Sequence, residues 1–174
     1  ALFMGEGGEP ASGAAIFAGI EGTRPLLCEF QALVSPSSLG APRRAVVGWD
    51  AARLSMLLAV LDTRCGMDFG RHDVFLNVAG GLRISEPAAD LAAVAALLSS
   101  RLDAPLPAKL AIFGEIGLSG AVRGVPQMDT RMAEARKLGF EKILCPTGAD
   151  GNDKTQRRRV EQAADVVSYV KGLA

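Results

Sequence analysis

Few side chains of this sequence could carry out covalent catalysis. Ser85 and Ser119 have hydroxyls that could attack a carbonyl. Lys109 or His72, the one histidine of the chain, could serve as the base that activates such a hydroxyl. Each residue also fits a structural role: Ser85 a helix cap, Ser119 a turn, and Lys109 a solvated strand end. His72 stands between an arginine and an aspartate, a context typical of a solvated side chain. The pattern favours structural roles over a catalytic site.

No short motif predicts a nucleotide or metal site. A phosphate-binding loop of the form Gly-x-x-x-x-Gly-Lys-Ser/Thr is absent, and neither Gly80-Gly81 nor the glycines at 114, 117 and 120 have the required lysine. We interpret those glycines as turns or sites of close backbone packing. Acidic side chains are scattered and do not resemble a set of metal ligands. The sequence therefore predicts neither an ATPase site, nor a metal site, nor any other cofactor in this domain.

Composition narrows the class of protein. A chain of 174 residues with 49% hydrophobic residues fits one domain with a sizeable core. Positive and negative side chains balance at 19 each, so binding to a polyanion would need a local patch. Cys28, Cys65 and Cys145 are odd in number and lie far apart in apolar runs, which is typical of reduced cytosolic thiols. The sequence shows no signal peptide and no apolar run that could cross a bilayer, and predicts a cytoplasmic protein with no membrane partner.

The elements that must position any site alternate between strands and helices, which predicts an α/β (α+β) fold with a mixed sheet and flanking helices. Strands are expected at residues 13–20, 25–34, 45–48, 73–79, 109–118, 142–145 and 159–162. Helices are expected at residues 51–64, 88–98, 129–138 and 163–171. Loops are expected at residues 35–42 and, polar and mobile, at 147–159, with a hairpin turn at 21–24.

Local signals define the ends of the helices. Asp50, Ser85 and Asp129 are the predicted N-caps, because their side chains can accept hydrogen bonds from free N–H groups of the first turn. Gly66 and Gly139 are the predicted left-handed residues that end helices. The helix body at 88–98 is almost entirely Ala, Val and Leu, so we expect it to be buried on most sides.

Three long motifs relate this sequence to a known family. They are Asn-Val-Ala-Gly-Gly-Leu-Arg-Ile-Ser-Glu-Pro-Ala-Ala-Asp-Leu at 77–91, Phe-Gly-Glu-Ile-Gly-Leu-Ser-Gly-Ala-Val-Arg at 113–123, and the segment 135–146. Shorter matches at 21–25, 31–34 and 42–44 extend the likeness over nearly the whole chain. The sequence resembles the proteolytic domain of Lon proteases and, more closely, the Lon-like C-terminal domain of the bacterial RadA (Sms) family of DNA repair proteins.

The resemblance implies where a peptidase site would lie. Lon-type peptidases attack with a serine that a lysine activates. Their Gly-Pro-Ser-Ala-Gly motif aligns with residues 86–90, so that Ala88 stands at the serine position. Counting back from the shared ending at 139–146 places the lysine position at Arg131, and the interval of 43 residues from Ala88 matches the family without gaps. Alanine cannot attack, and arginine stays protonated at physiological pH, so we predict no peptidase activity.

The resemblance also implies a larger parent protein. It identifies residues 1–12 as a linker from a missing N-terminal region and residues 13–174 as the Lon-like domain. Zinc, ATP and magnesium are then expected only in that N-terminal region, which would make the parent a DNA-dependent ATPase. The implied partners are the protein's own RecA-like ATPase domain and further copies of itself in a ring, expected to be a hexamer.

Arginines are the side chains that could contact DNA, because guanidinium groups suit phosphate. The candidates are Arg43, Arg44, Arg83, Arg123 and Arg131. Each could instead pair with a nearby carboxylate, as Glu86 or Asp90 could with Arg131. The RadA resemblance favours a DNA-contacting oligomerisation scaffold for branch migration, acting on single-stranded or branched DNA. Two alternatives stay open, namely a scaffold without any DNA contact, and a serine–lysine peptidase that uses other residues.

Overall fold

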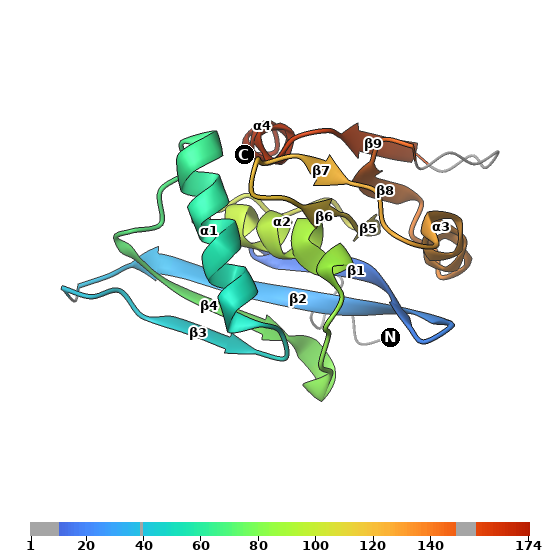
Figure 1. Cartoon of the computed structure of the whole chain (residues 1–174), viewed down its shortest axis with the longest axis horizontal. Coiled ribbons are helices and arrows are strands. Elements are labelled where there is room, and N and C mark those ends of the chain that lie inside the picture. Colours follow the sequence, from blue (N-terminus) through green and yellow to red (C-terminus); the bar gives the residue numbers. More distant parts are fainter. Residues whose placement is uncertain (1–10, 39, 149–155) are drawn as a thin grey trace.

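The computed structural model describes residues 11–38, 40–148 and 156–174. Within them, one seven-stranded sheet has the strand order β3-β4-β2-β1-β5-β8-β9, and a separate pair is formed by β6 and β7 (Figure 1). The strands are β1 (Ala14–Glu21), β2 (Arg24–Pro36), β3 (Arg44–Val47), β4 (His72–Val78), β5 (Leu110–Ile112), β6 (Glu115–Ile116), β7 (Val122–Arg123), β8 (Lys142–Pro146) and β9 (Gln156–Val160). The predicted α/β fold with a mixed sheet and flanking helices is confirmed.

Helices alternate with groups of these strands along the chain, and α4 follows the last strand (Figure 1). The α-helices are α1 (Ala51–Cys65), α2 (Asp90–Arg101), α3 (Met128–Lys137) and α4 (Ala163–Lys171), and the two 3₁₀ turns are η1 (Ala79–Gly81) and η2 (Pro87–Ala89). Helix α2 packs on β1 and β2, and α1 and α4 pack on α2 and on each other, whereas α3 packs against β1 and β2. None of the helices within the described residues is long and apolar enough to cross a membrane.

The hairpin of β1 and β2 forms the centre of the sheet. Its antiparallel register runs from Ala14 opposite Gln31 to Glu21 opposite Arg24, which leaves a two-residue turn. Gly22 in that turn has a φ of 64°, a conformation that glycine adopts without steric cost. The predicted hairpin is therefore confirmed. Strand β2 also pairs with β4. Successive side chains of β2 point to opposite faces of the sheet, so one face packs on the helices, whereas Leu33 on the other face is 60% exposed.

Helix α2 is the buried centre of the helical layer, as predicted. All its residues from Asp90 to Ser99 are buried. Such a helix has no polar face, because apolar neighbours surround it on every side. The hydroxyl of Ser99 donates to the carbonyl of Ala104 (2.6 Å) and accepts from the N–H of Gly13 (2.9 Å), so the buried polar group is fully paired.

The helix-end predictions are confirmed at one N-cap and wrong at two. The carboxylate of Asp50 accepts from Ala52 N, and Gly66 and Gly139 have φ angles of 67° and 89°. Ser85 is exposed and caps no helix, because Pro87 starts a 3₁₀ turn before α2 begins. Asp129 lies inside the first turn of α3, since Gln127 occupies the preceding cap position in a left-handed conformation.

The prediction of a single strand at 109–118 is wrong, because this apolar run forms two short strands, β5 and β6. Gly114 separates β5 from β6 and has a φ of 154°. Its N–H donates to the carbonyl of Ala88 (2.8 Å), and its carbonyl accepts from the N–H of Leu91 (3.0 Å). A Cβ at Gly114 would lie 3.1 Å from the side chain of Leu91. The strand therefore breaks where the backbone must approach the start of α2 closely.

The segment expected to be a polar loop at 147–159 contains strand β9, so that part of the prediction is wrong. Residues 149–155 lie outside the described residues, and so do residues 1–10 of the predicted linker. Residues 156–160 pair in parallel with β8 at an edge of the sheet, which corrects the strand expected at 159–162. This strand was not predicted at residues 156–160, because the three consecutive arginines Arg157–Arg159 resemble a solvated segment. An edge strand tolerates such charges, since only one of its sides is paired.

The three cysteines are all free thiols in the structure, in agreement with the prediction. Burial, helped by the negative charge of Glu86, raises the pKa of the Cys28 thiol to about 12. Burial also raises the pKa of Cys145 to about 11 and that of Cys65 to a lesser extent, and Cys65 is the most exposed of the three. A thiolate is the reactive form, so a raised pKa makes a thiol inert.

We therefore predict that iodoacetamide at pH 8 alkylates Cys65 first and leaves Cys28 and Cys145 unmodified until the protein unfolds. Peptide mass spectrometry of the folded and urea-unfolded protein measures this order. Alkylation of Cys28 in the folded protein at the rate of Cys65 would contradict the burial on which the prediction is based.

Candidate functional site

Arg131 is a buried cation at the position that the Lon resemblance assigns to the catalytic lysine. It projects from α3 and is 2% exposed. Its Nε donates to the carbonyl of Pro126 (2.9 Å), and its Nη1 donates to the carbonyl of Ala18 on β1 (3.0 Å). A buried charge is costly unless it is paired and hydrogen-bonded, so these contacts are needed for the fold.

The remaining partner of Arg131 is the carboxylate of Glu86. Arg131 Nη2 lies 2.6 Å from Glu86 Oε1, and Nη1 lies 3.4 Å from Oε2. Oε2 also accepts from the N–H of Ile20 on β1 (2.8 Å). Gly19 leaves room for this approach, since a Cβ there would lie 3.1 Å from Oε2. The sequence left Glu86 and Asp90 open as partners of Arg131, and the structure selects Glu86.

Ala88, at the position that the Lon resemblance assigns to the serine, lies two residues after Glu86 in the 3₁₀ turn η2. It is 3% exposed, and its carbonyl accepts the Gly114 N–H described above. Glu86 thus connects the two positions of the predicted dyad, because it precedes Ala88 and binds Arg131. At the two positions that the Lon resemblance assigns to a serine and a lysine, the structure has the methyl group of Ala88 and the paired guanidinium of Arg131.

A second ion pair lies beside this turn and was not predicted. Asp90 is fully buried, and the guanidinium of Arg53 donates through Nε and Nη2 to its two carboxylate oxygens. The N–H of Ile116 also donates to Asp90 (2.9 Å), and Glu115 lies 3.7 Å from Arg53. Burial raises the pKa of Asp90, while Arg53 opposes that shift. The pair joins α1, α2 and β6 with the geometry of a bidentate arginine–carboxylate contact.

Arg43 and Arg44 lie next to each other at the start of β3, and both have partners. Arg43 contacts Asp73 through Nη2 (3.0 Å), although 64% of its side chain is exposed. The backbone N–H and the guanidinium of Arg43 together hold the pKa of Asp73 below its ordinary value. Arg44 donates to the carbonyls of Phe69 (2.9 Å) and His72. Both arginines keep an exposed surface, because their partners occupy only part of each guanidinium.

Arg83 and Arg123 are exposed but lie elsewhere. Arg83 follows the end of β4, and β3 and β4 are parallel, so Arg83 and Arg44 are at opposite ends of these strands. Arg123 belongs to the separate pair β6–β7, where its guanidinium lies against the backbone of Gly117. The structure therefore brings only Arg43 and Arg44 together among the five arginines proposed for DNA contact.

The alternative catalytic residues also lie apart. Ser119 accepts from the N–H of Ala121 (3.3 Å) in a turn, and Lys109 Nζ lies 5.2 Å from the centre of the Phe140 ring. Within residues 11–38, 40–148 and 156–174, no serine hydroxyl is hydrogen-bonded to a lysine. His72 packs edge-on against the Phe69 ring.

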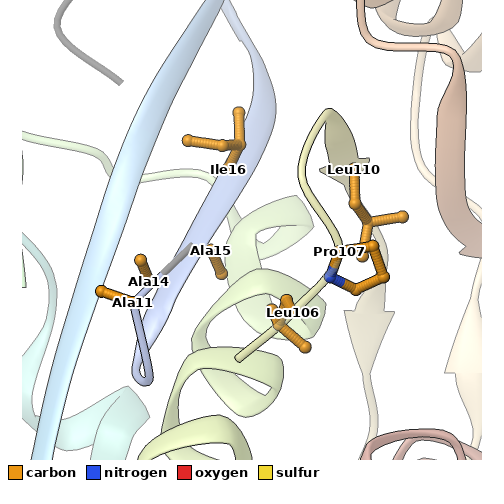
Figure 2. Close-up of a pocket in the computed structure, with 7 residues that line it drawn as sticks. All are labelled: Ala11, Ala14, Ala15, Ile16, Leu106, Pro107 and Leu110. Carbon is orange, nitrogen blue, oxygen red and sulfur yellow. The ribbon is translucent and has the colours of Figure 1, made fainter. Parts of the chain in front are cut away.

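The structure also has a small apolar hollow that is lined by none of the candidate catalytic or DNA-contacting residues. Figure 2 shows its side chains, which come from β1 and residue 11 before it, and from the start of β5 and the segment before it. They are Ala11, Ala14, Ala15, Ile16, Leu106, Pro107 and Leu110. Its volume of about 10 Å³ would hold about one water molecule, so it is no binding site for a substrate. The described residues also hold no group of three or more histidine, cysteine or acidic side chains that could bind a metal.

Comparison with known protein families identifies the class of protein to which this chain belongs. Residues 39–149 match the family described as ChlI, subunit ChlI of Mg-chelatase. This match covers more than half of the chain, so the chain belongs to that family. It includes β3, β4, η2, α2 and α3, and therefore both positions of the predicted dyad.

The resemblances to whole sequences are more specific. The chain is 56% identical over 173 residues to the DNA repair protein RadA of Brucella abortus, a match of 99% of this chain and 37% of that protein. It is 51% identical over 144 residues to RadA of Rickettsia felis and 49% identical over 148 residues to RadA of Haemophilus influenzae. The predicted resemblance to RadA is confirmed. The chain spans about a third of the length of these curated relatives.

Two features of this site were not predicted from the sequence. The partnership of Arg53 with Asp90 joins residues 37 positions apart, and no helical spacing connects them. Glu86 was considered only as a possible partner of Arg131, and the hydrogen bond that it receives from Ile20 on β1 was not predicted. A signal was present in Gly19, because a glycine inside an apolar strand indicates a close approach of another group.

The buried Arg131 gives a prediction on stability. We expect Arg131→Ala to lower the free energy of unfolding by about 3 kcal/mol, because it leaves Glu86 and two carbonyls without their donor. Lys137→Ala, on the exposed end of the same helix, should change it by less than about 0.5 kcal/mol. Urea unfolding followed by circular dichroism measures both, and equal effects would contradict the structural role of Arg131.

Proposed function

We propose that this chain is a catalytically inactive, Lon-like domain of a RadA-type DNA repair ATPase, and that it serves as an oligomerisation scaffold with DNA contacts. The observation that carries the proposal is the buried ion pair of Arg131 with Glu86, two residues from Ala88. The high identity to RadA proteins over almost all of this chain supports the repair role. The matched family is named after a chelatase subunit, but we do not propose a chelatase activity for this chain.

The geometry supports the loss of peptidase chemistry. Ala88 offers no hydroxyl, and Arg131 has donors engaged by two carbonyls and a carboxylate. A general base must have a free lone pair near the nucleophile, and a protonated guanidinium has none. The vacated site thus acts as a structural joint between α3, β1 and the start of α2.

Contact with DNA would come from exposed arginines. Arg43, Arg44, Arg83 and Arg123 keep exposed surface, whereas the burial of Arg131 removes it from this group. A domain with balanced charges binds DNA weakly by itself. Repetition of the same arginines around a ring would raise the affinity through multivalency.

The scaffold role completes the proposal. The domain would hold copies of the protein in a ring, expected to be hexameric, next to each copy's RecA-like ATPase domain. ATP and magnesium would act in that ATPase domain during branch migration, with zinc in a separate N-terminal module. The protein would act on single-stranded or branched DNA in the cytoplasm.

A scaffold without DNA contact is the second candidate. The ion pair of Arg43 with Asp73 and the bonds of Arg44 to backbone carbonyls favour it, because both arginines already serve the fold. A serine–lysine peptidase remains the third alternative, although Ser85 is exposed and apart from any lysine partner within the described residues.

DNA binding separates the first two candidates. We expect the chain to bind a labelled single-stranded oligonucleotide at 50 mM salt, and the double substitution Arg83→Ala/Arg123→Ala to weaken binding. Each lost phosphate contact should lower the slope of log affinity against log salt by about 0.7. Arg24→Ala/Lys171→Ala is the control with the same loss of charge. If the wild-type chain forms oligomers in ultracentrifugation but does not bind DNA, the result favours a scaffold without DNA contact.

Peptidase activity tests the third candidate. We predict that the chain neither hydrolyses casein nor reacts with a fluorophosphonate probe, since Ala88 replaces the nucleophile. Gel fluorescence after probe treatment, with a serine protease as positive control, measures the labelling. Labelling that Ser85→Ala abolishes would establish a different nucleophile and contradict the inactive site.

A further inference from the structure

Strand β9 carries three consecutive arginines that the proposed function does not use. The strand lies at the edge of the sheet, where β8 is its one neighbour among the described residues. The side chains of Arg158 and Arg159 are exposed, and that of Arg157 is half-buried. Pairing with β8 therefore holds in one extended segment three cations for which the sequence predicted a loop.

The three side chains alternate between the two faces of the sheet, as in any strand. Arg158 lies on the side of α4, because its guanidinium carbon is 5.7 Å from the centre of the Tyr169 ring. Arg157 and Arg159 therefore point to the opposite face, and both have a further interaction within the chain. A cation over an aromatic ring is held by the ring's quadrupole, so the N–H groups of Arg158 can still donate to a phosphate.

Strand β7 brings a fourth arginine to the end of β9. The N–H of Val122 donates to the carbonyl of Glu161 (2.9 Å), and the two segments form an antiparallel bridge. Because they run in opposite directions, the exposed Arg123 follows Val122 toward Arg159 rather than away from it (Figure 1). We name the β9 arginine cluster for its four members, Arg123, Arg157, Arg158 and Arg159.

Few acidic side chains lie near this cluster among the described residues. The segment between β9 and α4 has one, the exposed Glu161. Asp165 in the first turn of α4 accepts from two backbone N–H groups of that segment (2.9 Å each). Glu115, opposite Arg123 in the β6–β7 pair, lies 3.7 Å from Arg53. The cluster therefore has an excess of positive charge, although the whole chain is neutral.

We propose that the β9 arginine cluster binds the phosphate backbone of a single-stranded nucleic acid. Exposed arginines repeat along an extended strand, and an extended nucleic acid repeats its phosphates, so charge-assisted hydrogen bonds can form at successive positions along both. The exposed guanidinium of Arg158 also offers a plane on which a base can stack, with Tyr169 beside it. This inference rests on the proposed DNA contact and gives it a location.

The one tyrosine and the one tryptophan of the chain make the cluster and the core separately observable. In protein that carries fluorotyrosine and fluorotryptophan, we expect a single-stranded oligonucleotide at low salt to shift the ¹⁹F resonance of Tyr169. The resonance of Trp49 should not move, because Trp49 is 5% exposed and packs edge-on against Phe30. Polyglutamate is the second probe, and we expect it to leave Tyr169 unshifted, because it has neither phosphates nor bases.

Charge-removing variants test the contact by fluorescence anisotropy. Arg158→Gln/Arg159→Gln should weaken oligonucleotide binding about tenfold, and should lower the slope of log affinity against log salt by about 1.4, since each of two lost phosphate contacts contributes about 0.7. Arg24→Gln/Arg71→Gln is the matched control and should change binding less than twofold. Both control residues are exposed, and β1, β5 and β8 separate their strands, β2 and β4, from β9. An unchanged Trp49 resonance shows that each variant is folded.

The outcomes distinguish this inference from the proposed function. If the wild-type chain binds the oligonucleotide but Tyr169 does not shift, or if Arg158→Gln/Arg159→Gln binds like wild type, the cluster is not the site, while DNA contact stands. Equal losses in this variant and in the control would also overturn the location. If polyglutamate shifts Tyr169 as strongly as the oligonucleotide does, the cluster recognises acidic protein segments instead. If the wild-type chain binds no oligonucleotide, the inference and the proposed DNA contact both fail.

Discussion

The ion pair between Arg131 and Glu86 is the interaction on which the central part of the structure depends. A guanidinium that is 2% exposed must have its charge and donors compensated, and its partners come from three separate segments. Glu86 in turn accepts from Ile20, so the pair fixes α3 against β1 and against the start of α2. This arrangement replaces, at the same place in the fold, the chemistry that the Lon resemblance would otherwise assign to it.

The surrounding backbone shows why that place is rigid. Gly114 binds Ala88 and Leu91 through its two backbone groups, and Asp90 holds Arg53 from inside the protein. The turn η2 is thus attached to β5, β6 and α1 while Glu86 attaches it to α3. Ala88 in this turn is 3% exposed, and its carbonyl accepts from Gly114. The turn η2 is therefore a joint between the sheet and the helices.

Much of the fold could be predicted from the sequence because it is local. The two-residue turn at Gly22, the cap at Asp50 and the left-handed Gly66 follow from residue types alone. The errors arose where tertiary contacts override local preference, as at Gly114, which breaks an apolar run to reach α2. Strand β9 was missed because pairing with β8, not composition, makes its arginines extended. Of the site, the positions of Ala88 and Arg131 came from the resemblance, but the burial of Arg131 needed the fold.

The coupling energy between Arg131 and Glu86 tests the central claim most directly. It is obtained from the unfolding free energies of Arg131→Met, Glu86→Gln and the double variant in a thermodynamic cycle. We predict a coupling of about 2 kcal/mol or more, because each single variant leaves one charge of the pair without its opposite charge, whereas the double variant removes both charges. A coupling below about 0.5 kcal/mol would show that the two side chains act independently, and would contradict a structural joint at the vacated site.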